Sequence, residues 1–118
     1  MPQQWARVSG SSVPLSEVKA ELFKALAHPA RVRVLEVLLD GERSVGELQP
    51  LVGIELSHLS QQLGVLRRAG LVTARKERSS VFYALRDPLV GTLLSVAKQL
   101  LVTALAQTRD LLAAAEAG

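Results

Sequence analysis

The sequence contains no cysteine and few aromatic residues. Trp5, Phe23, Phe82 and Tyr83 are the only aromatic side chains in 118 residues, although 48% of the residues are hydrophobic. The missing thiols exclude disulfides, thiolate metal sites and cysteine nucleophiles. A core built mainly from Leu, Val and Ala suits packed helices, and the length allows one domain.

Long apolar runs and catalytic motifs are also missing. The N-terminal residues lack the apolar segment of a signal peptide. The sequence contains no uninterrupted run of about 18 apolar residues, so no membrane span is predicted. We therefore expect a cytoplasmic protein with no membrane partner. Neither a Gly-rich phosphate loop, a nucleophile elbow nor an HExxH motif is present, so we do not expect an enzyme. Residues 1–13 are polar and contain Gly and Ser. We interpret them as a flexible arm, with anchoring through Trp5 as the alternative.

Hydrophobic periodicity predicts a mainly helical domain over residues 14–118 with one small β-hairpin. His28 and Pro29 suit the start of a helix, and Ser44 and Glu47 have the spacing of a capping box. A short turn with Gly53 then joins two helices, which is typical of a helix-turn-helix. The expected helices are 15–27, 29–39, 45–52, 56–69 and 87–115, and the expected strands are 71–76 and 81–85, joined by residues 77–80.

Positive charge is concentrated in residues 57–86. This segment has six basic residues and one acidic residue, a net charge of +5, whereas the rest of the chain has eight basic and ten acidic residues. Such segregation is typical of a protein that binds a polyanion, and a polar helix beside the basic segment favours duplex DNA over a merely solvated face. The side chains expected at base edges are Ser57, His58, Ser60, Gln61 and Gln62. Those expected at or near phosphates are Arg67, Arg68, Arg75, Lys76, Arg78, Ser79 and Ser80.

The last predicted helix is apolar around most of its circumference. Its apolar residues include Leu89, Leu93, Val96, Leu100 and Leu101, more than one stripe can bury in a small domain. Burial against a second copy, related by a two-fold axis, satisfies this excess. The sequence therefore predicts a homodimer through this helix.

Three segments resemble the ArsR/SmtB family of winged helix-turn-helix transcriptional regulators. They are FKALAHPARVRVLEVL (23–38), SVGELQPLVGIELSHLSQQLGVLRRAGLV (44–72) and RKERSSVFYAL (75–85). The resemblance implies the order α-α-α-α-β-β-α, with a recognition helix at 56–69 and a wing at the hairpin. It also implies a dimer interface in which the first helix joins the last, through Leu15, Val18 and Leu22. Such proteins usually repress promoters, as a dimer on a palindromic operator, and release DNA when an effector binds; activation is left open.

The sequence departs from the family at its metal sites. The third-helix segment SVGELQP has no cysteine, and Asp87 of the last helix is followed by no histidine. The common metal sites are therefore missing and the metal ligands are unknown. Alternatives left open are a noncanonical Ni²⁺ or Zn²⁺ site using His28 or His58 with carboxylates, and an interaction module that acts with a protein co-regulator.

Overall fold

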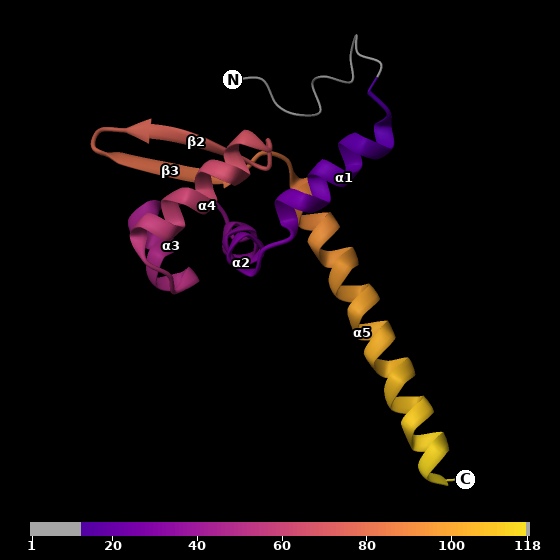
Figure 1. The fold of residues 1–118 in the computed structure, drawn as a ribbon. Coiled ribbons are helices and arrows are strands. Elements are labelled where there is room, and N and C mark those ends of the chain that lie inside the picture. Colours follow the sequence, from indigo (N-terminus) through magenta and orange to yellow (C-terminus); the bar gives the residue numbers. More distant parts are fainter. Residues whose placement is uncertain (1–12, 118) are drawn as a thin grey trace.

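The computed structural model describes residues 13–117 and has the predicted order of elements, with one additional strand (Figure 1). Residues 1–12, including Trp5, lie outside the described part, so the interpretation of the N-terminal arm stays a prediction. The elements are α1 (Leu15–Leu26), α2 (Pro29–Leu38), β1 (Arg43–Ser44), α3 (Val45–Val52), α4 (Leu56–Arg68), β2 (Val72–Glu77), β3 (Ser80–Leu85) and α5 (Pro88–Ala117).

Local capping residues set the helix boundaries that the sequence predicted. His28 caps α2, because its Nδ1 accepts a hydrogen bond from the Ala30 backbone N–H at 3.1 Å. At α3, Ser44 Oγ accepts from the Glu47 N–H at 3.2 Å, and Glu47 Oε1 accepts from the Ser44 N–H at 3.0 Å. Gly53 ends α3 with a φ of 77°, a conformation that glycine adopts without a Cβ penalty. Both predicted caps are confirmed.

The sheet has three antiparallel strands in the order β1-β3-β2. Glu77 pairs with Ser80, so only Arg78 and Ser79 form the turn at the tip of the wing. The predicted four-residue connection was therefore too long, because both flanking residues join the ladder. Arg78 has a φ of 57°, uncommon for a residue with a side chain. Strand β1 was not predicted, since two residues are too few to show periodicity.

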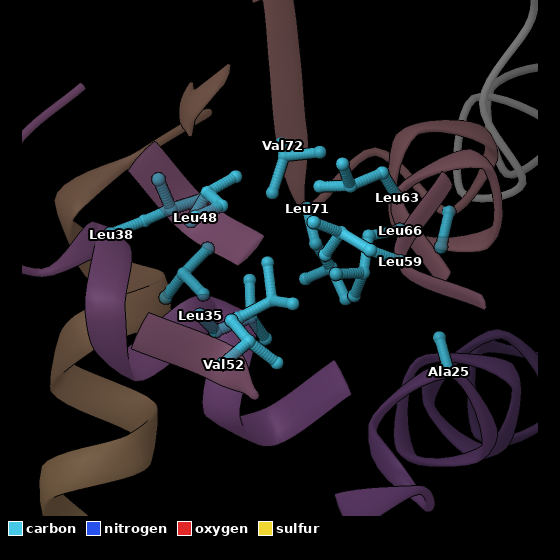
Figure 2. Close-up of a cluster of buried hydrophobic side chains, with 13 residues drawn as sticks. Ala25, Leu35, Leu38, Leu48, Val52, Leu59, Leu63, Leu66, Leu71 and Val72 are labelled. Atoms are coloured by element: carbon cyan, nitrogen blue, oxygen red, sulfur yellow. The ribbon is translucent and has the colours of Figure 1, made fainter. Parts of the chain in front are cut away.

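The core lies where α2, α3, α4 and β2 meet (Figure 2). It consists of aliphatic side chains, as the composition predicted. Each helix contributes the leucines or valines of one face, so the polar residues of α4 are held on the opposite face. Its fully buried members are Val34, Leu35, Leu48, Val52, Leu59, Leu63, Leu66 and Val72.

Much of the remaining apolar surface is uncovered within one chain. Helix α5 projects from the winged-helix body (Figure 1), and every residue from 95 to 117 is exposed. Leu15 of α1 is 56% exposed and Leu100 of α5 is 68% exposed. Helix α5 is long and apolar enough to cross a membrane by length and composition alone, although the sequence has no uninterrupted apolar run of that length. Phe23 of α1 and Leu39, just after α2, are also exposed.

Candidate nucleic-acid interface

Helix α4 has one apolar face and one polar face. Leu59, Leu63 and Leu66 anchor the helix in the core, and this fixes the direction of the opposite side. That side carries hydroxyl, amide and guanidinium groups and no carboxylate. Its exposed polar residues are Ser57, Ser60, Gln61, Arg67 and Arg68. Because these groups donate hydrogen bonds and carry only positive charge, the face suits the major groove of DNA.

Gln62 and His58 of α4 are less exposed than their predicted role at base edges requires. Gln62 is buried, with only 7% of its surface exposed, and its Oε1 has no hydrogen-bond partner among the described residues. His58 is half-buried and packs edge-on to His28, with 5.8 Å between ring centroids. The structure thus contradicts the prediction that Gln62 lies open to DNA. The reason lies in tertiary packing, because α2 packs against α4 and His28, just before α2, lies against His58.

The wing presents a second basic surface beside α4. Strand β2 packs against α4, so the hairpin lies beside the helix that carries the polar face. Lys76 on β2 and Arg78 in the turn are exposed, as are the hydroxyl-bearing Ser79 and Ser80. Lys76, Arg78, Arg67 and Arg68 form no ion pair within residues 13–117. Their charges are therefore available to an external anion.

Arg75 is engaged within the protein instead. Its Nε and Nη2 donate to Oε2 and Oε1 of Glu42 at 3.1 and 2.6 Å, and its Nη1 donates to Oε2 of Glu77 at 2.6 Å. The guanidinium also lies 4.8 Å from the centre of the Phe82 ring. The hydrogen bonds from Arg75 lower the pKa of the Glu42 carboxyl, and the two carboxylates raise the pKa of Arg75.

The Arg75 cluster changes the charge distribution that the sequence indicated. Two carboxylates compensate Arg75, so it contributes less to the positive surface than Lys76 or Arg78 does. Reasoning from sequence missed Glu42, which lies 33 residues away from Arg75. No local signal in the sequence indicated this pairing.

The histidines and acidic residues do not form a metal centre in the described part of the chain. His28 and His58 are close, yet residues 13–117 contain no group of three or more His, Asp or Glu side chains placed to hold an ion. Asp87 has a structural role, because its Oδ1 accepts a hydrogen bond from the Leu89 N–H at 2.8 Å in the first turn of α5. The donor set therefore does not fit the metal sites common in the family that the sequence resembles.

The comparisons with known proteins match the part of the chain that contains the helix-turn-helix and the start of the wing. The model of the arsR family of bacterial regulatory proteins matches residues 28–74, from the cap of α2 into the wing. The HTH-type transcriptional regulator Rv0081 of Mycobacterium tuberculosis is 54% identical over 95 residues, which cover 80% of this chain and 83% of that protein. A biofilm growth-associated repressor of Agrobacterium fabrum is 52% identical over 68 residues, 58% of each chain.

Solved structures agree with this fold. The crystal structure of Rv0081 has a TM-score of 0.75 at 52% identity and covers 81% of this chain and 97% of its own. The homodimeric winged helix-turn-helix DNA-binding domain of Mb0332 from Mycobacterium bovis has a TM-score of 0.72 at 30% identity, and covers 79% of this chain and 86% of its own. With a winged helix-turn-helix and close relatives that regulate transcription, this chain belongs to the arsR family of bacterial regulatory proteins.

Proposed function

We propose that this regulator acts in the cytoplasm as a dimeric repressor that reads a palindromic operator. One observation carries the proposal. The carboxylate-free polar face of α4 lies beside the wing, whose Lys76 and Arg78 form no ion pair within residues 13–117, because β2 packs against α4. A duplex that receives α4 in its major groove brings its backbone close to such a wing. Blocked access of RNA polymerase to the promoter then accounts for repression.

Base reading and phosphate binding divide between two elements in this proposal. Gln61 lies in the exposed face of α4, and its amide can pair bidentately with adenine. Ser57 and Ser60 lie beside it and complete the base-reading set. Arg78 at the wing tip and Lys76 contact phosphates, which position the protein without reading sequence. We leave Gln62 out of this set, and Arg75 contributes only if its carboxylate partners release it.

Two substitutions test this division. A preferred duplex is first selected from a random library with the full-length protein. Fluorescence anisotropy is then measured on this duplex and a scrambled duplex at several salt concentrations. Gln61→Ala should weaken binding to the selected duplex by about 1–3 kcal/mol and spare the scrambled one. Arg78→Ala should weaken both and lower the salt slope by about one unit.

Matched controls come from the projecting half of α5. Gln99→Ala and Arg109→Ala remove the same chemical groups from exposed positions far from α4 along the chain, and should leave DNA affinity unchanged. Equal weakening of both duplexes by Gln61→Ala would contradict the base-reading role. An unchanged salt slope for Arg78→Ala would contradict the phosphate role.

The dimer rests on the exposed apolar surfaces of α1 and α5. Leu15, Leu89, Leu100 and Leu101 are each more than half exposed in the single chain, and burial of such area is the main driving force of association. Val18 is already buried within the chain, so we remove it from the predicted interface set. Leu22 and Leu93 stay in that set as partly covered side chains, and Val96 stays in it as an exposed one.

Metal sensing is the second candidate function, and the proximity of His28 and His58 is the observation that favours it. Nδ1 of His28 is occupied by the Ala30 N–H, so only its Nε2 is free to bind an ion. Titration of Ni²⁺ or Zn²⁺ into the full-length protein tests this candidate. Binding lost in the His28→Ala/His58→Ala double variant would support it. An unchanged DNA affinity with and without metal would contradict it, and would favour a co-regulator or another signal.

A further inference from the structure

A groove of about 340 Å³ lies between the end of α1, the start of α2 and the end of α4. Its charged residues are Lys24, Arg31, Arg68 and Glu21, three bases and one acid. Ala25, Val65 and Ala69 supply the small apolar part of its lining. Of the lining residues, only Arg68 belongs to the predicted DNA contacts, and none belongs to the predicted dimer interface.

The positive charge of the groove is poorly compensated. Lys24 and Glu21 form a long ion pair of 3.6 Å whose side chains are largely solvated, and exposed pairs of this kind contribute little. Within residues 13–117, neither Arg31 nor Arg68 pairs with a carboxylate. The Nε of Arg31 is buried and has no hydrogen-bond acceptor in that part of the chain. An unpaired buried donor is costly. An oxyanion in the groove removes this cost once the guanidinium turns toward it.

Arg68 connects the groove with the outer face of α4. Its Nη1 lies 3.2 Å from the position that a Cβ on Gly64 would take, so the guanidinium folds back over the glycine. Arg68 thus lines the groove and borders the face that we assign to DNA. A ligand that draws Arg68 into the groove removes a positive charge from that face.

We propose that this groove is an effector site for a small phosphate ester, and that its occupancy weakens DNA binding through Arg68. The guanidinium groups match the geometry of phosphate oxygens, Lys24 adds a point charge, and the apolar lining suits a short carbon skeleton. The recessed, buried Nε of Arg31 favours a small ligand over the phosphate of a rigid duplex. The regulatory half of this proposal rests on the proposed function; the binding half does not.

The first experiment measures binding without DNA. Inorganic phosphate is titrated into the full-length protein at constant ionic strength, with chloride as the control anion, and the arginine Nε–H signals are followed by NMR. Wild-type protein should show a saturable shift of the Arg31 signal with phosphate only. Arg31→Gln should weaken the phosphate affinity by about tenfold or more, as expected for a lost charge-assisted hydrogen bond.

Two further variants control for charge and folding. Arg33→Gln makes the same change at an exposed residue of α2 that does not line the groove, and should keep the wild-type affinity. Arg31→Lys retains the charge but loses the planar guanidinium group. Its phosphate affinity should lie between those of wild type and Arg31→Gln. Shifts that do not saturate, or equal affinities for Arg31→Gln and Arg33→Gln, would overturn the site.

The second experiment separates a free ligand from the DNA backbone. At constant ionic strength, phosphate should weaken binding of wild-type protein to the selected duplex and leave Arg31→Gln unaffected. If phosphate has no such effect, and Arg31→Gln lowers the salt slope by about one unit, the groove holds a DNA phosphate and the effector proposal is wrong. Because the first experiment contains no DNA, its failure leaves the DNA-binding function intact.

Discussion

Helices α4 and α5 are both rich in leucine, yet their leucines have opposite environments. Leu59, Leu63 and Leu66 of α4 are at most 1% exposed, whereas Leu100 and Leu105 of α5 are 68% and 65% exposed. The difference depends on where each helix lies in the fold. Other elements of the same chain cover the apolar face of α4, while α5 leaves the body after its first turns (Figure 1). The same residue type therefore stabilises the fold in α4 and remains available for association in α5.

The sharpest test makes the same substitution in both helices. Leu63→Ala removes a fully buried side chain and should lower the free energy of unfolding by about 2–5 kcal/mol. Leu100→Ala should change the unfolding of the single chain far less, because it leaves no cavity there. Urea unfolding, followed by circular dichroism at low protein concentration, gives both values. Equal losses at the two positions would contradict the contrast between the helices.

A charge placed on α5 should separate association from folding. Leu100→Asp puts a carboxylate into the proposed interface, where an unpaired buried charge is strongly unfavourable. We expect it to dissociate the dimer while the winged-helix body stays folded. Light scattering at micromolar concentration measures the mass, with Gln99→Asp as a control that adds the same single negative charge at an exposed position of the same helix. A folded wild-type monomer at that concentration would refute the dimer itself.

A smaller effect is expected at the cap that starts α3. Ser44→Ala removes the side-chain acceptor for the Glu47 N–H and should cost about 1 kcal/mol of stability, the usual value for a lost N-cap. The loss of stability should be confined to the winged-helix body and leave the dimer unchanged. Urea unfolding and light scattering measure the two properties. Ser95→Ala is the control, because Ser95 is exposed and lies inside α5 rather than at the start of a helix. It should change neither the stability nor the dimer by loss of a cap.

The smallest expected effect concerns Glu42 and the wing. Arg75 lowers the pKa of the Glu42 carboxyl by hydrogen bonding. The ion pair therefore contributes stability above the unfolded-state pKa of Glu42, and loses it as the pH falls through the lower folded-state pKa. Glu42→Gln should remove this acid dependence, which urea unfolding between pH 3 and pH 7 measures.

Glu42→Gln should lower the stability of the fold but raise the affinity for DNA. Without the Glu42 carboxylate, Arg75 is freer to meet a phosphate, so the salt slope should rise by up to about one unit. Glu116→Gln, near the end of α5, is the matched control. A lower DNA affinity for Glu42→Gln would indicate that the carboxylate orients the wing rather than competing for Arg75.

Much of the fold could be predicted because its signals are local. The caps at His28 and Ser44 each depend on residues within three positions, and the leucines of α4 follow helical spacing. The polar face of α4 followed from the same spacing. Contacts between distant segments leave no local pattern in the sequence. The sequence therefore did not indicate β1, the pairing of Glu42 with Arg75, or the burial of Gln62.

By itself, the sequence determined the order of the elements, the polar face of α4 and the excess of apolar surface on α5. These properties depend on the spacing of residue types, and a regular helix or strand converts spacing into faces. The tertiary structure alone decided which polar groups remain available to DNA. Tertiary packing buried Gln62, and a carboxylate 33 residues away engaged Arg75. Burial and ion pairing depend on which segments meet in space, which helical and strand periodicity do not encode.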